Sequence, residues 1–431
     1  MKISFFEKFY NWKYSSDIND ELKNIKKLSS YDRDEFLQWQ EAAKWKIAEH
    51  HFYNNNFYHT TTGDTLPSSW NDLPIMTRDI YQNNKVLDNS STESLYINTT
   101  SGTTGAPLKF AKDYKTQARV WAAKKRFFNL HGISTGSKEA RFYAMPKGCK
   151  NILIENIKDI ILNRTRFNVF DMSEIIFDEW IKRFKKKDFE YAYGFTSAIV
   201  LFSRYLLEKS ICLKQICPSI KVCIVTSEIC THEDKKIIEE AFGIKVVIEY
   251  GSKDVGLIGY ECEEGNLHIP EENVYIELND DNEILVTDLS NTAFPFIRYL
   301  LGDKVTISNN TCQCGSHNRI IETLDGRSNE LIILPNNRSI PSLVFLIIMR
   351  TELENLGNLK EFVVHQTKKD SFVLNIATDI VISEVQKGHL HEVAKNYLQT
   401  EIKLMINQVD SIEREPSGKL KFFYSELESL L

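Results

Sequence analysis

The chain has 431 residues, of which 42% are apolar and 26% charged, as is usual for a globular protein. This length exceeds one ordinary domain and predicts one large or two unequal domains. The net charge of −6 comes from 59 acidic and 53 basic side chains spread along the chain, so we expect neither nucleic acid nor an anionic membrane as a partner.

The sequence also argues against export and membrane insertion. The longest purely apolar run, residues 343–349, is much shorter than the about 20 residues that a membrane span needs. Glu7 and Lys8 interrupt the N-terminal apolar residues, so no signal peptide is expected. We therefore predict a bacterial-type cytoplasmic protein whose eight cysteines stay reduced, as thiols or metal ligands.

In chain order, residues 1–90 are predicted to be mostly helical, and residues 73–80 form a turn that leads into a short helix. Residues 95–97 are a strand candidate. The middle of the chain alternates strands and helices, which predicts a parallel sheet with helical crossovers. The expected strands are 189–193, 220–226 and 244–249, and the expected helices are 197–209 and 231–242.

Polar residues follow two of these strands, at 226–228 and 250–254. Ligands of open α/β sheets lie outside the carboxyl ends of the strands, so both segments are expected to face one crevice. Short strands follow at 274–278, 283–286 and 296–299, the first two joined by an acidic turn. Residues 326–330 are the predicted domain boundary. A small α+β module follows, with strands at 361–366 and 372–377 and a helix over 382–400.

The segment 99–107 (TTSGTTGAP) begins with seven consecutive Thr, Ser or Gly residues. Accessible backbone N–H groups and five hydroxyls suit a polyphosphate. A solvated linker is the alternative, but the strand before it and Pro107 after it favour a structured turn. The spacing is not that of a Walker loop.

This segment resembles the TSGTTGxP signature of the adenylate-forming superfamily, which includes acyl-coenzyme A synthetases, peptide-synthetase adenylation domains and luciferases. Four further motifs match in the same order, from about residue 70 to 420. Ser227-Glu228 resembles the adenine-side loop, and residues 250–254 (YGSKD) resemble YGxSE. Residues 297–303 (IRYLLGD) resemble IRYxTGD, and residues 415–419 (EPSGK) resemble PxSGK.

The resemblance implies an α/β fold with two domains. Residues 1–327 would form a large N-terminal domain, with mixed and parallel sheets, that holds the ATP and acid sites. Residues 328–431 would form a small, mobile α+β domain that carries the catalytic lysine. The phenylacetate–coenzyme A ligase-like branch, including relatives associated with capsular polysaccharide synthesis, is the most similar, on the motifs around residues 73–80 and 312–315.

The family's reaction implies the roles of the matching residues. A carboxylate attacks the α-phosphorus of ATP and pyrophosphate leaves, after which the acyl group passes to coenzyme A or to an amine or hydroxyl acceptor. Lys419 and Asp254 would be catalytic, with Asp254 holding Mg²⁺. The implied nucleotide-binding residues are Thr100, Ser101, Gly102, Thr103, Thr104, Gly105, Ser227, Glu228, Tyr250, Gly251, Ser252, Lys253, Asp303 and Arg327. A homodimer is one option for the assembly.

The chain departs from the family pattern at several positions. Lys253-Asp254 replaces Ser/Thr-Glu, and Leu108 separates Pro107 from Lys109, so whether Lys109 or Lys253 contacts phosphate is open. Lys419 taken alone would be an ordinary solvated lysine. The alternative to an enzyme is therefore a catalytically impaired nucleotide-binding homologue with a regulatory or scaffold role.

Cys262, His268, Cys312 and Cys314 form a second set of candidate ligands. Three thiolates and one imidazole are a common structural zinc set, and the C-x-C spacing suits one tight loop. The alternative is reduced, unliganded thiols. The other cysteines lack such spacing, and Cys223, inside an apolar strand, is predicted to be core.

Aromatic residues at 142–145 and 191–195 are candidates for lining an acid pocket. Aromatic side chains at strand ends are more often part of the core, so both interpretations stay open at this point.

Overall fold

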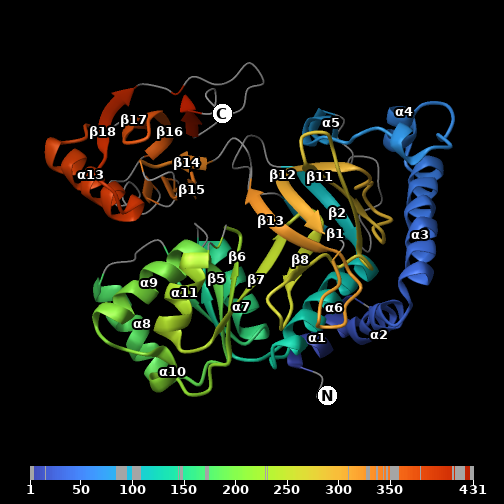
Figure 1. Ribbon diagram of the computed structural model, residues 1–431, viewed down its shortest axis with the longest axis horizontal. Coiled ribbons are helices and arrows are strands. Elements are labelled where there is room, and N and C mark those ends of the chain that lie inside the picture. The colour runs from blue at the N-terminus through green and yellow to red at the C-terminus, as the bar shows by residue number, and fades with distance from the viewer. Residues whose placement is uncertain are drawn as a thin grey trace. The chain divides into compact units, whose positions relative to one another are not determined.

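A computed structural model of the chain describes residues 4–14, 16–83, 95–99, 108–143, 145, 149–169, 174–228, 230, 232–308, 310–326, 331–335, 338–342, 344–345, 348–349, 359–378, 380–409, 412 and 423–427 (Figure 1). The described residues form two compact units. Unit 1 extends to Leu324 and unit 2 begins at Asp325. The functional roles predicted for the two domains stay predictions.

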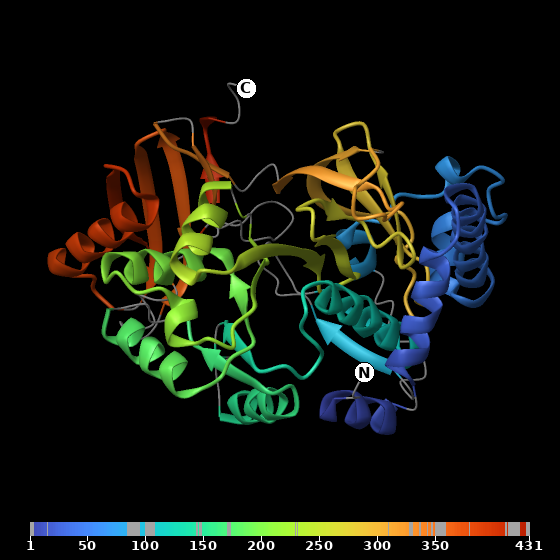
Figure 2. The same cartoon turned by 60° about the horizontal axis from the view of Figure 1, so that its bottom comes forward.

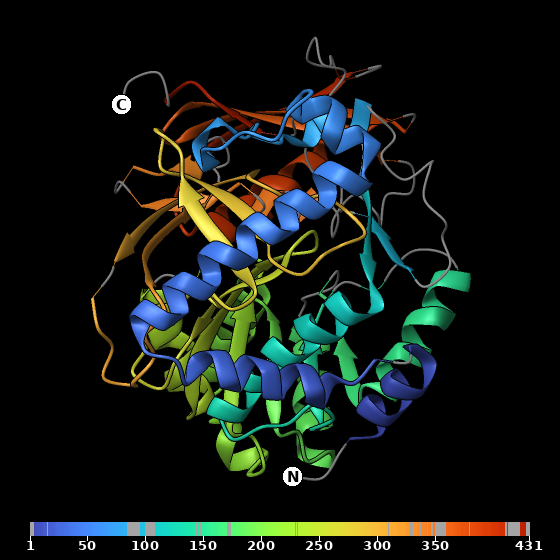
Figure 3. The same ribbon diagram turned by 90° about the vertical axis from the view of Figure 1, so that its right-hand side faces the viewer.

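The N-terminal part of unit 1 is helical, as predicted. Figure 3 shows α2 and α3 lying along the outside of the unit. Asp17 caps the start of α2, and Asp32 and Glu35 form a capping box at the start of α3, which explains why these helices begin there. The helices are α1 (Phe5–Tyr14), α2 (Ile18–Ser29), α3 (Arg33–Asn54), α4 (Asn56–Thr62), the 3₁₀ turn η1 (Trp70–Asp72) and α5 (Arg78–Asn83).

An 11-stranded sheet is the centre of unit 1, with the order β10-β11-β12-β13-β9-β8-β7-β6-β5-β3-β4 among the described strands. Strands β4, β3, β5, β6 and β7 are parallel, and β7 turns back antiparallel into β8. The strands are β3 (Glu139–Phe142), β4 (Arg164–Phe167), β5 (Tyr191–Phe195), β6 (Val222–Thr226), β7 (Lys245–Ser252), β8 (Gly256–Glu261), β9 (Leu267–His268), β10 (Val274–Leu278), β11 (Glu283–Asp288), β12 (Tyr299–Ser308) and β13 (Ile320–Gly326).

Helices cover both faces of the parallel strands. On one face, side chains of α6 pack with Tyr191, Tyr193, Ile224 and Val247. On the other, α8, α9 and α11 pack with the alternate residues of the same strands, including Cys223, which is buried as predicted. The remaining elements of unit 1 are β1 (Leu95–Thr99), β2 (Lys109–Asp113), α6 (Tyr114–Leu130), α7 (Cys149–Ile161), α8 (Glu174–Lys186), α9 (Thr196–Glu208), α10 (Leu213–Ile216) and α11 (His232–Phe242).

The predicted parallel strand–helix alternation is confirmed, with two corrections. The strand expected at 244–249 continues through Tyr250 and Gly251 to Ser252, because these residues pair with β8. The strand expected at 296–299 is wrong: β12 begins only at Tyr299, after Arg298, whose φ of 46° interrupts the extended backbone.

Unit 2 contains a four-stranded sheet, β18-β17-β16-β19, and a two-stranded sheet of β14 and β15. Figure 2 shows α13 beside the strands of the larger sheet, where its Leu390, Ala394 and Leu398 join the core of the unit. The predicted α+β character is confirmed. The elements are β14 (Leu331–Ile333), β15 (Ser339–Pro341), β16 (Leu359–Lys368), β17 (Ser371–Thr378), α13 (Glu384–Leu398), β18 (Lys403–Val409) and β19 (Phe423–Ser425).

Two general expectations concern the described residues as a whole. None of the described helices combines the length and the apolarity needed to cross a membrane. The seven cysteines whose side chains the structure describes are all free thiols.

Candidate functional site

The predicted YGSKD segment lies at the β7–β8 hairpin, beside the point where the sheet changes from parallel to antiparallel pairing. A Cβ on Gly251 would come within 2.4 Å of the carbonyl oxygen of Gly256, so only glycine fits there. Lys253 is exposed at the tip of the hairpin, and Asp254 is buried just after it. The hairpin thus holds the motif in a fixed backbone arrangement.

Two tyrosines tie this hairpin to the IRYLLGD segment. The Tyr250 hydroxyl donates to Asp303 Oδ2 at 2.7 Å, and the Tyr299 hydroxyl donates to Asp254 Oδ2 at 3.0 Å. Each predicted carboxylate is therefore oriented by a tyrosine of the other segment. Sequence reasoning assigned no role to Tyr299, although the residue belongs to the matching motif.

Arg298 holds the IRYLLGD segment in place. Its guanidinium donates to the carbonyl oxygens of Asn71 and Leu73, at 2.7 and 2.6 Å, and its backbone carbonyl accepts from Met76 N. These contacts fix the left-handed backbone of Arg298 immediately before Tyr299. The predicted turn around residues 73–80 therefore helps to hold Arg298 in position.

Ser227 directly follows β6 and is exposed, with a left-handed φ of 69°. Its hydroxyl lies 3.2 Å from the Tyr143 hydroxyl at the end of β3. The carbonyl of the next residue, Glu228, accepts from Thr196 Oγ1 at 3.3 Å. The predicted adenine-side residues thus lie at the carboxyl edge of the parallel strands, where an α/β sheet binds ligands.

Several predicted site residues lie outside the described residues. These are Thr100, Ser101, Gly102, Thr103, Thr104, Gly105, Arg327 and Lys419. Just after the loop, Leu108 is buried in the core and Lys109 is exposed at the start of β2. A role for Lys109 or Lys253 on phosphate stays a prediction, as do the roles of the nucleotide-binding residues.

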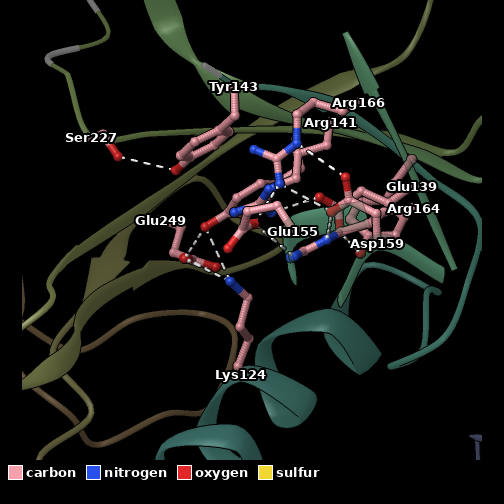
Figure 4. A network of polar contacts seen from close by, with 12 residues as sticks. Lys124, Glu139, Arg141, Tyr143, Glu155, Asp159, Arg164, Arg166, Ser227 and Glu249 are labelled. Atoms are coloured by element: carbon pink, nitrogen blue, oxygen red, sulfur yellow. Dashed lines mark hydrogen bonds and ion pairs between the residues drawn. The ribbon is translucent and has the colours of Figure 1, made fainter. Parts of the chain in front are cut away.

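A network of charged and aromatic side chains lies beside Ser227, on the α6 face of the sheet (Figure 4). The Tyr143 ring is parallel to the Tyr193 ring, with centroids 5.9 Å apart, and the Arg141 guanidinium lies 4.1 Å from the Tyr143 centroid. Of the predicted acid-pocket aromatics, Phe142 belongs to the core on the opposite face, whereas Tyr143 and Tyr193 belong to this network.

The charges of this network are largely paired. Burial alone would raise the pKa of Glu139, but Arg141 and Arg164 hold that pKa below its ordinary value. Burial and then the nearby Glu249 carboxylate raise the pKa of Tyr193 far above its ordinary value, so its hydroxyl stays protonated and donates to Glu249 Oε1 at 2.6 Å. Lys124 Nζ donates to the same oxygen at 3.1 Å. Sequence reasoning did not identify Lys124 or Glu249 as site residues.

The four predicted metal ligands come together near strands β8 and β9. The ligand atoms of Cys262, His268, Cys312 and Cys314 all lie within 4.8 Å of one another. The Cys262 and Cys312 sulfurs are 3.7 Å apart, and Cys314 Sγ is 3.4 Å from His268 Nε2. A tetrahedral ion with Zn–S bonds of about 2.3 Å would separate two sulfurs by about 3.8 Å, so the spacing fits zinc.

The surroundings of the four ligands suit a metal as well. His268 Nδ1 lies 2.9 Å from the Asn318 carbonyl oxygen, which would keep the proton on Nδ1 and leave Nε2 for the ion. The Asn266 amide donates to Cys312 Sγ at 3.2 Å. Burial opposes ionisation of Cys312, but hydrogen bonds, the largest from the Cys314 backbone, lower the pKa of Cys312. Burial and the neighbouring Cys312 and Cys262 thiols raise the pKa of Cys314, so the cluster without an ion favours one thiolate. Metals bind the thiolate form.

Comparisons with known proteins support the fold assignment. No protein-family model matches the chain. Protein CapK of Staphylococcus aureus is 22% identical over 438 residues, covering 96% of this chain and 93% of CapK. The structure of 2-hydroxyisobutyryl-CoA ligase in the postadenylation state, in complex with R3-HIB-AMP, has a TM-score of 0.60 and 15% identity, covering 94% of this chain and 92% of the ligase.

The same ligase in complex with 2-HIB-AMP and CoA, in the thioesterification state, has a TM-score of 0.61 and 16% identity, covering 94% of this chain and 93% of the ligase. This chain therefore has the fold of that acyl-CoA ligase over nearly its whole length. The α/β fold predicted from the motifs is confirmed.

Proposed function

We propose that the chain is an ATP-dependent ligase that activates a carboxylic acid as its acyl-adenylate and releases pyrophosphate. The acyl group would then pass to coenzyme A or to an amine or hydroxyl acceptor. The observation that carries the proposal is the pair of tyrosine–carboxylate bonds between the YGSKD and IRYLLGD segments, within a fold shared with a ligase solved in its postadenylation state.

The proposed mechanism assigns a task to each motif. Negative charge accumulates on the phosphate oxygens as the carboxylate attacks, so cations and oriented N–H groups supply the stabilisation. The loop 99–107 would provide N–H and hydroxyl donors, and Lys419 a cation. Asp303 would accept from the ribose hydroxyls. Asp254 offers a carboxylate, a ligand type that Mg²⁺ prefers, and Mg²⁺ when bound would neutralise phosphate charge.

Two finer parts of the proposal have separate support. A role in surface polysaccharide biosynthesis is proposed from the resemblance of the motifs to the capsular polysaccharide branch, and the chain is similar to protein CapK over 96% of its length. The spacing of the four ligand atoms supports a structural zinc ion held by Cys262, His268, Cys312 and Cys314. Four protein ligands would leave no open position on the ion, so we assign it no part in the reaction.

ATP–pyrophosphate exchange with a panel of carboxylic acids tests the function. We expect exchange with at least one acid, and a loss of about 100-fold or more in Lys419→Ala, the size of effect seen when a charge-stabilising group is removed. Lys403→Ala is the matched control, because Lys403 is an exposed lysine of unit 2 outside the motifs, and it should retain exchange.

The outcomes separate the enzyme from its alternative. Absence of exchange with every acid, in a protein that still binds ATP, would favour the impaired nucleotide-binding homologue. Equal loss of exchange in Lys419→Ala and Lys403→Ala would reject the catalytic role of Lys419.

A further inference from the structure

Glu249 is buried and only half satisfied. Its Oε1 accepts from both Tyr193 and Lys124, at 2.6 and 3.1 Å, whereas its Oε2 is buried without a hydrogen-bond partner among the described residues. The residue is 9% exposed. A buried hydrogen-bond acceptor without a donor raises the free energy of the folded protein, and more so when the group is ionised. A donor on a bound molecule would satisfy this oxygen.

Glu249 lies near the carboxyl edge of the parallel strands, beside the candidate site. In the sheet register it is opposite Thr226, the last residue of β6, and it immediately precedes Tyr250 of the YGSKD segment. Figure 4 shows its carboxylate directed toward Lys124, near the Tyr143–Ser227 pair. The reacting carboxylate of the substrate must come close to the nucleotide, so a group that meets Glu249 would be a substituent on the acid's chain.

The charges around Glu249 define the chemical class of that substituent. Lys124 already balances the Glu249 carboxylate, and the Arg141 guanidinium lies 4.9 Å from the Tyr193 ring centroid. Arg141 is itself paired with Glu139 at 2.7 Å, so an ammonium group of the substrate would add an unbalanced positive charge beside Lys124. A neutral O–H group can donate to Oε2 without adding charge.

We propose that Glu249 makes this enzyme selective for carboxylic acids that carry a hydroxyl group, with Oε2 accepting the hydroxyl proton. The inference rests on the proposed function, because it concerns the acid that the same site activates. Glu249 is a specificity-determining residue here and takes no part in the chemical step.

Matched sets of acids test the hydrogen bond directly. Butyrate, 3-hydroxybutyrate and 3-methoxybutyrate, with the corresponding propionate and phenylacetate sets, differ only at the substituent. A methoxy group keeps the acceptor oxygen and loses the donor. In ATP–pyrophosphate exchange we expect kcat/KM of the wild type to favour a hydroxy acid at least about tenfold over its plain and methoxy partners, as one hydrogen bond of about 1.4 kcal/mol would give.

Glu249→Gln should remove this preference without emptying the site. Lys124 and Tyr193 would take the amide oxygen, so the amide NH₂ would face the substrate and donate equally well to a hydroxyl or a methoxy oxygen. In Glu249→Gln we expect the ratio of kcat/KM for a hydroxy acid to kcat/KM for its methoxy partner to fall to about threefold or less. In the wild type the same ratio should be at least about tenfold, which corresponds to about 1.4 kcal/mol. Glu139→Gln is the control and should keep the wild-type ratio, because both Glu139 oxygens already have partners, Arg141 and Tyr191.

The outcomes distinguish this inference from the function on which it rests. Exchange with plain and methoxy acids as good as with hydroxy acids in the wild type would overturn the inference and leave the ligase function standing. A preference that survives in Glu249→Gln would also overturn it. Absence of exchange with every acid would reject both proposals. Glu249→Asp, which keeps the charge and withdraws the oxygens, gives a second variant, and it should lower the preference for hydroxy acids.

Discussion

At the scale of single residues, the reciprocal tyrosine bonds explain why the two motifs contain tyrosine. Tyr250 and Tyr299 each belong to one of the two motifs, yet each hydroxyl donates to the carboxylate of the other motif. A carboxylate held by a donor loses less rotational freedom on binding ATP than a free one would. Both hydroxyls are therefore expected to matter for nucleotide affinity.

Removing the Tyr250 hydroxyl tests this expectation. Tyr250→Phe should weaken ATP binding about three- to tenfold, because Asp303 loses a hydrogen bond to an ionised group. The measurement is ATP affinity by isothermal titration calorimetry, which does not require turnover. Tyr205→Phe is the matched control: it removes a hydroxyl that donates to Asp178 at 2.8 Å, on helices outside the site, and should leave ATP affinity unchanged. Equal affinity in Tyr250→Phe and the wild type would remove Tyr250 from the site.

Short motifs predict candidate-site residues that lie close together in the chain, but not residues brought together over long separations. Ser227, Tyr250 and Asp303 are candidates because a motif surrounds each one. Lys124 and Glu249 are 125 positions apart, and neither stands in a distinctive pattern. Their proximity depends on how α6 packs on the sheet, which local spacing does not encode.

At the scale of elements, the strands that sequence reasoning found are the apolar ones. β6, with the sequence VCIVT, is fully buried and was predicted. β3, with the sequence EARF, was not, because it lacks the continuous apolar run of a buried strand; alternation over only four residues, with Glu139 and Arg141 on one face, predicts at most a short strand with that face solvated. In the structure that face is covered, and the two side chains pair with each other and with their neighbours. Buried ion pairs therefore hide a strand from an argument based on apolar periodicity.

The loop between β12 and β13 gives an element-scale prediction for the metal. It carries Cys312 and Cys314, and its His317 carbonyl accepts from Arg33 at the start of α3. Cys314→Ser should lose zinc and lower the midpoint of thermal unfolding, because the loop loses a cross-link. Elemental analysis and scanning fluorimetry, with and without a chelator, are the measurements.

Cys212→Ser is the control for this experiment, because Cys212 is a half-buried free thiol outside the cluster. It should keep stoichiometric zinc and the wild-type response to the chelator. A wild-type protein purified without stoichiometric zinc would reject the metal proposal and favour the unliganded thiols.

At the scale of the whole molecule, the two units can be followed separately. All six tryptophans precede residue 325, so tryptophan fluorescence reports on unit 1 alone. This separation matters because a chain of two units need not unfold in one cooperative step.

Tryptophan fluorescence should show that protonation of one buried histidine, His51, destabilises unit 1 at acid pH. His51 is 1% exposed, its Nε2 lies 2.7 Å from the Asn291 carbonyl oxygen, and burial lowers its pKa from 6.5 to about 4. The unfolded chain binds a proton below pH 6.5, whereas the folded unit does so only near pH 4. The contribution of His51 to stability is therefore full above pH 6.5 and is lost between pH 6.5 and 4, by about 3 kcal/mol.

His51→Gln keeps a donor for Asn291 but cannot take up the proton. In urea unfolding followed by tryptophan fluorescence, the wild type should lose about 3 kcal/mol more than His51→Gln when the pH falls from 7 to 4. His50→Gln, which changes the half-buried neighbour, should follow the wild type. Equal losses in the wild type and His51→Gln would mean that the folded unit accommodates a charged His51, and that burial there does not suppress its protonation.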